Sequence, residues 1–466
     1  MKTLIRLTGW LGLSLVVSGC ATFGPHHSTP DTESLLSDGV LVADYQNSEK
    51  VLTEWWTAFH DDRLSELVSQ ALQHNRDLKA LSSNVKASRA NLRLARLDRI
   101  PADQISASAT ESRQSAAAVG QSEAFSDTEL YSVSFAPQWD LDLFGRLSRQ
   151  IEISKSNYEA QLMQLRGLQL MVIGDVASNY FQLQSLLSER DTLQRNIGLQ
   201  KESLRIAEVL LEYGRGIEVD VLNARAQLQS SQAAMPPIDA SISQTQARLA
   251  VLTGRAPGAL QQGLASISTA SYINHALPIG ELSELIRRQP SIRAAERKLA
   301  SSVSEVGLAV SSMFPQVSLV GSVGYSAQQS EQLFEDNALQ FSFGPTLSWS
   351  LSNLVLGKQR INAAEHRSQA AFAEYENSVL FALEDLNAAL ANQKAARDRQ
   401  PLLDSALSDS RESARIAKVQ YEFGASPLRE LIDAELKLLQ AELAAKRGVY
   451  EIIIAQISVF RALGAG

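Results

Sequence analysis

The chain carries two copies of one sequence pattern, and this duplication constrains its fold more than any other feature. Residues 202–214 read ESLRIAEVLLEYG and residues 412–424 read ESARIAKVQYEFG, so that eight of thirteen positions are identical without a gap. Further upstream, the tetrapeptide LSEL at 64–67 recurs at 282–285. A shared helical composition can produce one accidental match, but it does not explain an ordered series of them. We therefore predict a fold built from two structural repeats.

Each predicted repeat has the order helix, two strands, long helix, turn, helix. A helix over 146–213 would be roughly 100 Å long at 1.5 Å per residue, so it needs partners along its length and coiled-coil packing is expected. Its counterpart at 359–423 contains Pro401, where we expect a kink or a break. The predicted segments are a signal peptide at 1–19, an acylated N-terminal segment at 20–62, the first repeat at 63–260, a linker at 261–280 and the second repeat at 281–466.

Glycine, proline and helix-capping residues predict where other helices begin and end. The segment 64–99 has apolar residues at helical spacing without Gly or Pro, which predicts one helix. Gly214 and Gly424 are expected just past the ends of the two long helices. Ser426 followed by Pro427 predicts an N-cap and a first-turn proline. The sequence Met235-Pro236-Pro237 predicts an interruption that has no counterpart in the second repeat.

Four segments alternate between apolar and small polar residues, at 105–109, 131–141, 317–325 and 339–351. Period-two alternation places all the large apolar side chains of a strand on one face. A soluble sheet packed on one side gives the same pattern. Strand length, aromatic positions and an exported N-terminus favour strands that cross a membrane. Open strand edges are not tolerated in lipid, so several subunits are expected to share one barrel.

The N-terminus has the layout of a secretory signal peptide. Two positive charges, Lys2 and Arg6, precede an apolar run over 7–17. Small residues follow this run and lead to Cys20, the only cysteine in 466 residues. This arrangement resembles a bacterial lipoprotein signal, in which the cysteine is acylated and becomes the first mature residue. An ordinary signal peptide with a chance cysteine is the alternative. Because a lone thiol in an oxidising compartment is reactive, we favour acylation of Cys20.

Composition excludes several classes of function. One cysteine excludes disulfides, thiolate zinc sites and a cysteine nucleophile from the mature body. With a net charge of −8 the chain is not expected to bind nucleic acid. Neither a G-x-x-x-x-G-K-[ST] loop nor an H-E-x-x-H motif is present, and the six histidines are scattered. We therefore expect no enzyme activity and no cofactor other than a covalent lipid on Cys20.

Three motifs, in this order within the duplication, resemble the TolC/OprM-type outer-membrane efflux channels, in the lipoprotein (NodT-like) branch of the outer membrane factor family. They are Trp55-Trp56-x-x-Phe59-x-Asp61-x-x-Leu64 with Ala71-Leu72-x-x-Asn75-x-Asp77-Leu78, then WDLDLFG at 139–145, and LAVLTGR at 249–255. The resemblance covers Cys20 and nearly everything from Trp55 onward. Asp103, with an extra residue after Pro101, departs from the family pattern and predicts an irregular start of the first strand.

The resemblance implies an α+β homotrimer in which four strands per subunit form a transmembrane β-barrel, continued by a long periplasmic α-helical coiled-coil barrel. Such a protein lies in the outer membrane, in contact with its lipid and held also by the acyl anchor, with a periplasmic helical extension. It is a passive exit duct of a tripartite efflux system and docks with a periplasmic adaptor (membrane fusion) protein and an inner-membrane pump. The lining of such a duct is generic, so no cargo is predicted.

The resemblance also implies a gate at the helix–turn–helix ends. Carried over by position, an acidic constriction falls on Glu430 and Asp433, with Asp220 in the first half and Tyr421 just before the turn. Residues three apart share one helix face, and three copies would form a negative ring that favours cations. Acids in the first turns of a helix also stabilise its N-terminus. For Asp433 we favour the constriction, and for Glu430 both interpretations stay open.

A second hypothesis from a different class is a periplasmic lipoprotein adaptor or scaffold with coiled-coil hairpins. Such a protein would have the lipid anchor and the long helices but no strands that cross a membrane. The four alternating segments argue against it.

Overall fold

The computed structural model describes residues 23–30, 54–115, 127–260, 272–273 and 288–465. Cys20 and the second LSEL tetrapeptide lie outside these residues. The chain forms two compact units, each with residues from both predicted repeats. Unit 1 comprises 1–30, 84–161 and 294–375, and unit 2 comprises 31–83, 162–293 and 376–466.

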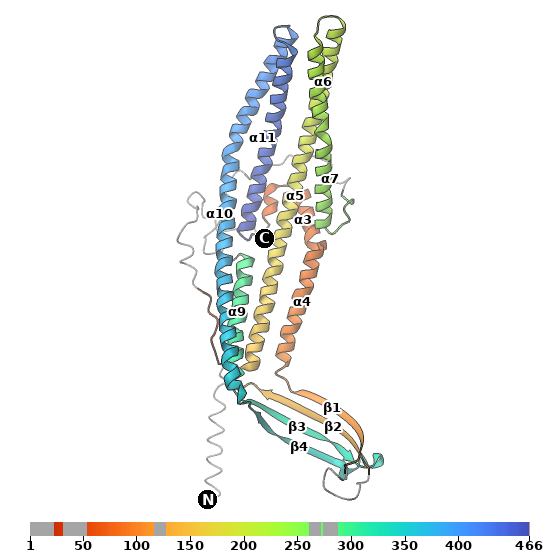
Figure 1. Ribbon diagram of the computed structural model, residues 1–466, viewed down its shortest axis with the longest axis vertical. Coiled ribbons are helices and arrows are strands. Elements are labelled where there is room, and N and C mark those ends of the chain that lie inside the picture. Colours follow the sequence, from red (N-terminus) through yellow and green to blue (C-terminus); the bar gives the residue numbers. More distant parts are fainter. Residues whose placement is uncertain (1–22, 31–53, 116–126, 261–271, 274–287, 466) are drawn as a thin grey trace. The chain divides into compact units, whose positions relative to one another are not determined.

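Unit 1 contains an antiparallel sheet with strand order β1-β2-β3-β4 (Figure 1). The strands are β1 (Ala102–Ser112), β2 (Thr128–Leu141), β3 (Gln316–Ala327) and β4 (Leu339–Ser348). The four predicted strands are thus confirmed, although β1 is longer than the predicted 105–109. The predicted irregularity at Asp103 is wrong, because Asp103 pairs with Pro137 and the register runs unbroken from Ala102 to Ser112.

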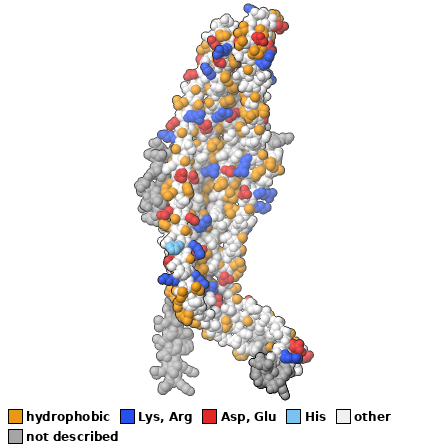
Figure 2. All heavy atoms as spheres, viewed as in Figure 1, with side chains coloured by type: hydrophobic (Ala, Val, Ile, Leu, Met, Phe, Trp, Pro, Cys, Tyr) orange, Lys and Arg blue, Asp and Glu red, His pale blue; other side chains and the backbone are white. Residues whose placement is uncertain are grey.

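The two faces of this sheet differ as the alternation predicted. On one face, apolar side chains are left uncovered, among them Phe341 and Phe343 of β4, which are 81% and 78% exposed. On the other face, hydroxyl groups pair across strands: the Oγ atoms of Ser106 and Ser134 are 2.8 Å apart, as are those of Ser108 and Ser132. Figure 2 shows the visible side of the sheet mostly in white, with charged side chains gathered at its loop end.

The helices confirm the predicted order within each half. Their bounds are η1 (Trp55–Phe59), α3 (Asp62–His74), α4 (Arg76–Leu97), α5 (Arg146–Glu212), α6 (Glu218–Ala233), α7 (Met235–Leu252), α9 (Pro290–Ser311), η3 (Ser330–Gln332), η4 (Asp336–Ala338), α10 (Ser352–Glu422) and α11 (Leu428–Ala462). Within the part of the chain that is described, no helix is both long and apolar enough to cross a lipid bilayer.

The predicted break at Pro401 is wrong, because α10 continues through this residue over 71 residues, whereas a kink without a break stays a prediction. An interior proline costs about 3 kcal/mol, and packing along so long a helix can offset that cost. Conversely, the predicted single helix over 64–99 is divided at Asn75, which has extended backbone angles and separates α3 from α4.

The buried side chain of Asn75 stabilises this break because it forms hydrogen bonds with the backbone at the start of α4 and at the end of α7. Its Oδ1 accepts hydrogen bonds from the backbone N–H groups of Asp77 at 2.9 Å and Leu78 at 3.1 Å, which caps α4. Its Nδ2 donates to the carbonyl oxygen of Leu252 at 3.0 Å, at the end of α7. The break therefore joins the start of α4 to the end of α7.

The predicted ends of the long helices are confirmed. Gly214 has φ +66°, and the N–H of Arg215 donates to the carbonyl oxygen of Leu210 at 2.8 Å, which is the bond of a Schellman motif. Gly424, with φ +71°, ends α10 in the same way, through a bond from Ala425 to Gln420 at 2.7 Å.

The next helix starts differently from the prediction. Pro427, and not Ser426, is the N-cap residue of α11, and no side chain accepts a capping hydrogen bond there. The predicted interruption at Met235-Pro236-Pro237 is confirmed, since α6 ends at Ala233 and α7 begins at Met235.

Candidate functional site

The two helix–turn–helix ends of unit 2 pack against each other. A cluster of buried side chains joins them, and half-buried apolar side chains surround it. The buried members are Ala207, Val221, Leu428 and Leu431, and the surrounding ones are Leu204, Ala417, Tyr421 and Ile432. Because these residues come from α5, α6, α10 and α11, the turn of the first half and the turn of the second half are held together within one chain.

Tyr421 and Asp220 are brought close together at this contact, although they lie in different halves of the sequence. Both side chains are half-buried. Burial raises the pKa of the Tyr421 hydroxyl, and the negative charge of Asp220 raises it further. Within the described residues the hydroxyl has no hydrogen-bond partner. Since a tyrosine hydroxyl is protonated at neutral pH, this one is available as a donor.

Glu430 and Asp433 lie on the exposed side of α11. Asp433 is 4.0 Å from Arg429, measured between Oδ2 and Nε, and both side chains are largely exposed. Glu430 occupies the first turn of the helix, where a carboxylate favours the helix N-terminus. In the described part of the chain no hydrogen bond or ion pair joins either carboxylate to Asp220 or Tyr421. Acidic and basic side chains both appear at the hairpin ends in Figure 2.

Sequence reasoning missed two ionisable groups at this site. One is Arg429, the cation beside Asp433. The other is Glu435, which lines a small cavity with side chains of α5 and α6, among them Gln200 and Ala224. Burial raises the pKa of Glu435, and the charge of Lys418 opposes this shift. The signal that could have revealed Glu435 is its position in the buried stripe of α11, four residues after Leu431 and four before Leu439.

A second polar arrangement in unit 2 lines a groove of about 720 Å³ between α5, α10 and α11. The guanidinium of Arg447 donates to both carboxylate oxygens of Glu189, at 2.8 and 2.6 Å. Glu189 is 8% exposed, so this bidentate pair neutralises a buried charge. Arg399 and Glu451 pair at 2.7 Å in the same groove. Beside them, burial raises the pKa of Tyr450 to about 12.

The described residues do not contain three or more His, Cys, Asp or Glu side chains placed to hold a metal ion. Cys20, the predicted lipid attachment residue, lies outside them.

Comparison with known proteins decides the family. The family model described as outer membrane efflux protein matches residues 67–255 and 282–465. The chain belongs to the outer membrane efflux protein family. Its two matched ranges correspond to the two halves of the duplicated sequence.

Relatives match along the whole chain. Nodulation protein T of Rhizobium leguminosarum bv. trifolii is 27% identical over 456 residues, covering 97% of this chain and 96% of that protein. Cation efflux system protein CusC of Escherichia coli K12 is 26% identical over 460 residues, covering 97% and 98%. A solved structure of the outer-membrane channel OprN is 34% identical with a TM-score of 0.88, covering 96% and 99%.

These findings confirm the predicted fold and function. The chain has the TolC-like fold, with four antiparallel strands and long helices, and it is the outer-membrane channel of a tripartite efflux pump and not an enzyme. It lies in the outer membrane with a periplasmic helical extension. The alternative of a periplasmic adaptor is set aside.

The motifs that carry the resemblance noted in the sequence have structural roles in this outer membrane efflux protein. Trp55 stacks on Phe460 with ring centroids 5.2 Å apart, and both are buried in unit 2. Asp61 caps α3 by accepting from the N–H groups of Arg63 and Leu64 at 2.9 and 3.0 Å. Gly254, with φ +73°, ends α7 where a side chain would collide with the backbone of His74.

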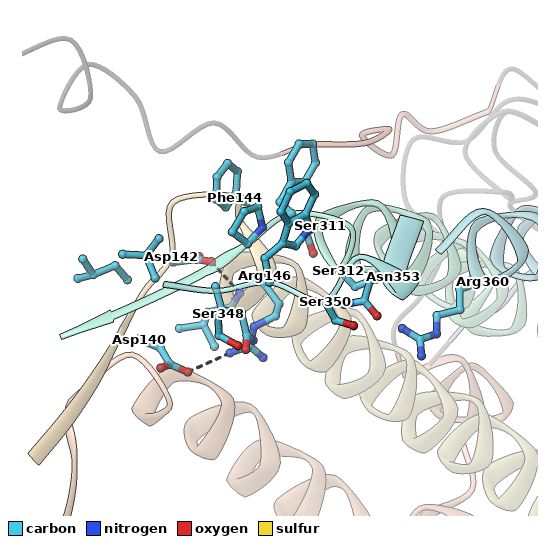
Figure 3. Close-up of a pocket in the computed structure, with 17 residues that line it drawn as sticks. Asp140, Asp142, Phe144, Arg146, Ser311, Ser312, Ser348, Ser350, Asn353 and Arg360 are labelled. Carbon is cyan, nitrogen blue, oxygen red and sulfur yellow. Dashed lines mark hydrogen bonds and ion pairs between the residues drawn. The ribbon is translucent and has the colours of Figure 1, made fainter. Parts of the chain in front are cut away.

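The WDLDLFG motif forms the passage from β2 to α5 (Figure 3). Asp142 caps α5 through the N–H groups of Leu147 and Ser148, at 2.9 and 2.8 Å. Asp140 pairs with Arg146 at 3.3 Å and accepts a hydrogen bond from Ser318 at 2.7 Å. These groups border a cavity of about 240 Å³ where the strands meet the helices. The motif therefore shapes the strand–helix junction.

Proposed function

We propose that three copies of this chain form one duct across the outer membrane, and that its periplasmic end opens and closes at the hairpin ends. The sheet carries the proposal: β1 and β4 each have a strand partner on one side only among the described residues, and the apolar face is uncovered. Lipid does not tolerate open edges, so the edges of one copy would pair with those of the next to close a barrel.

The gate is formed by Asp433, Glu430, Asp220 and Tyr421. Asp433 and Glu430 would ring the passage with carboxylates, which favours cations. Tyr421 and Asp220 would hold the hairpin of the second half against that of the first in the closed state. The support is their closeness at the packed hairpin ends and the buried hydroxyl of Tyr421, which has no hydrogen-bond partner within the described residues. Docking of a periplasmic adaptor protein and an inner-membrane pump would release this contact.

Cys20 is the proposed attachment point of the lipid, after removal of residues 1–19. The proposed organisation behind it is the acylated segment to residue 62, a first repeat at 63–260, a linker at 261–280 and a second repeat at 281–466. The support for the two repeats is the pair of family matches, at 67–255 and 282–465. Membership of CusC in a cation efflux system supports partners of the same kind for this chain.

Conductance in planar bilayers tests the gate. The double variant Glu430→Ala/Asp433→Ala is expected to lose cation preference, and Tyr421→Phe or Asp220→Asn to raise the open fraction. Asp409→Ala is the matched control, because Asp409 is an exposed acid of α10 about 20 Å before its end at 1.5 Å per residue. If conductance and cation preference of all these variants equal those of wild type, the gate assignment is wrong.

The trimer is tested separately. Outer-membrane fractions are expected to yield an SDS-resistant trimer that dissociates on heating. A monomer after mild detergent extraction would contradict the shared barrel, whatever the gate variants do.

A further inference from the structure

Arg149 is almost completely buried, and its partners are unusual for a helix residue. It lies in the first turn of α5 and is 1% exposed. Its guanidinium donates to the backbone carbonyl oxygens of Phe23, at 3.3 Å from Nε and 3.2 Å from Nη2, and of Gly24, at 3.1 Å. Nη1 donates to Glu152 at 2.8 Å and lies 3.5 Å from Nδ1 of His26.

These contacts hold the N-terminal segment 23–30 of the chain against α5. A buried guanidinium needs acceptors for its N–H groups, because an unpaired buried charge is strongly unfavourable. Glu152 supplies one acceptor from the same helix, and the backbone of Phe23 and Gly24 supplies the acceptors for the rest of the fork. Hydrogen bonds from a charged donor are about twice as strong as neutral ones. Arg149 therefore holds this segment through its main chain.

Two glycines let the segment approach the helices this closely. Gly24 has φ +94°, and a Cβ atom there would lie 2.7 Å from the Cα atom of Gly307 on α9. A Cβ atom on Gly307 would in turn lie 2.9 Å from Cδ of Arg149. Any side chain at Gly24 is excluded both by its backbone conformation and by the space available.

Aromatic and polar contacts continue the interface on both sides of the glycine. The ring of Phe23 lies 4.7 Å from that of Phe314 and 6.2 Å from that of Phe144, and those two rings stack at 4.9 Å. Phe144 follows β2 and Phe314 precedes β3, so one side chain contacts both halves where strands and helices meet. Beyond Gly24, the hydroxyl of Thr29 lies 3.3 Å from the carboxylate of Glu296 on α9. The segment appears in red in Figure 1.

We infer that Arg149 is a clamp that fixes the lipid-bearing N-terminus to the strand–helix junction. The inference rests on the proposed acylation of Cys20. Only two residues lie between Cys20 and Phe23, so three Cα-to-Cα steps join them, and three extended steps span roughly 10 Å. The acyl chains therefore enter the membrane within that distance of the clamp. The anchor is thereby a fixed part of the junction and not the end of a free tether, and Arg149 is its positioning residue.

Spin labelling tests the clamp in the full-length acylated protein. Ser28 is exposed, and acylation occupies Cys20, so Ser28→Cys supplies a free thiol for a nitroxide label. We expect an immobilised spectrum in the otherwise wild-type channel. Arg149→Ala is expected to make the label mobile and to accelerate chymotrypsin cleavage after Phe23 by roughly tenfold, the effect of losing charged hydrogen bonds. Arg149→Lys, which keeps the charge without the fork, is expected to restore part of the immobilisation.

Gly24→Ala tests the same interface without removing a charge from α5, so misfolding of the helix cannot produce its effect. It is expected to mobilise the label as Arg149→Ala does. Lys155→Ala, an exposed cation on the same helix, is the control and is expected to change nothing. An immobile label and unchanged cleavage in both Arg149→Ala and Gly24→Ala would overturn the clamp.

Mass spectrometry of the N-terminal peptide distinguishes failure of the Arg149 clamp from failure of the proposed acylation of Cys20. An acylated Cys20 with a mobile wild-type label contradicts the clamp and leaves the anchor in place. A Cys20 without lipid contradicts the anchor, and the positioning role of Arg149 fails with it.

Discussion

The indole N–H of Trp139 donates a hydrogen bond of 2.8 Å to the backbone carbonyl oxygen of Arg99. In the other half of the chain, the indole N–H of Trp349 donates to the carbonyl oxygen of Met313 at 3.0 Å. Each tryptophan lies at the end of the second strand of its half, β2 or β4. Each acceptor lies just after the helix that precedes the first strand of that half, α4 or α9. The sequence duplication therefore extends to individual hydrogen bonds at the strand–helix junction.

Replacing these indoles by phenyl rings tests their contribution. Trp139→Phe and Trp349→Phe each keep an aromatic ring and remove one hydrogen bond, so each is expected to destabilise the channel by about 1 kcal/mol. The temperature at which the SDS-resistant form dissociates measures this loss. Phe341→Leu, on an exposed aromatic of β4, is the control for the loss of aromatic volume that each Trp→Phe change also causes. If the Trp variants match that control, the two bonds contribute nothing.

The pH dependence of Glu435 follows from its burial. Burial raises the pKa of this carboxyl in the folded state above its ordinary value of 4.5. A raised carboxyl pKa favours folding below that ordinary value, and the benefit is lost as pH rises through the folded-state pKa. Glu435→Gln is therefore expected to raise the melting temperature at about pH 7.5 and to lose this advantage at about pH 4. Thermal unfolding followed by circular dichroism measures both.

An exposed acid near the same hairpin provides the control for Glu435. Glu422, at the end of α10, is exposed, so Glu422→Gln is expected to show no comparable gain at neutral pH. An equal gain from both variants would indicate a general charge effect and contradict a role for burial.

The glycines that end the long helices give a prediction about the hairpin turns. Gly214 and Gly424 have positive φ angles, and a Cβ atom on either would meet nothing within 4 Å. Alanine there costs only the left-handed conformation, about 1 kcal/mol at each site. Hydrogen exchange in the last turns of α5 and α10 is expected to accelerate roughly fivefold. Gly198→Ala, at an unhindered helical position of α5, should instead slow exchange.

The Arg447–Glu189 pair gives a prediction about the groove in unit 2. Arg447→Ala leaves the carboxylate of Glu189 buried and without its guanidinium, which is expected to cost about 1–3 kcal/mol. The added substitution Glu189→Gln removes the charge and is expected to recover part of that loss. A double-mutant cycle on thermal stability isolates the coupling. Additive effects would show that the two side chains do not stabilise each other.

Elements with strong local signals were predictable from the sequence. Alternation identified β4 because Phe341 and Phe343 contrast with small polar neighbours, whereas β1 alternates Ser with Ala and its ends were missed. The glycine ends of α5 and α10 were predictable because only glycine readily adopts the required φ. The break at Asn75 was missed because apolar spacing continues across it, and its cause is a bond to Leu252, far away in the chain.

The candidate gate was only partly predictable. Helical spacing placed Glu430 and Asp433 on α11, but no local pattern could place Tyr421 beside Asp220, because the packing of two separate hairpins brings them together. Arg149 gave no signal at all. It is one arginine among many in a polar helix, and only the fold shows that its guanidinium is buried against the main chain of Phe23.

The paired serines on the polar face of the sheet have a consequence for what the channel can export. Ser106 with Ser134, and Ser108 with Ser132, present hydroxyls that both donate and accept hydrogen bonds and carry no fixed charge. A solute passing such a wall can exchange its water for hydroxyl contacts whether it is an anion, a cation or neutral. In the proposed duct these hydroxyls would admit chemically diverse solutes, and the proposed gate carboxylates would discriminate between them.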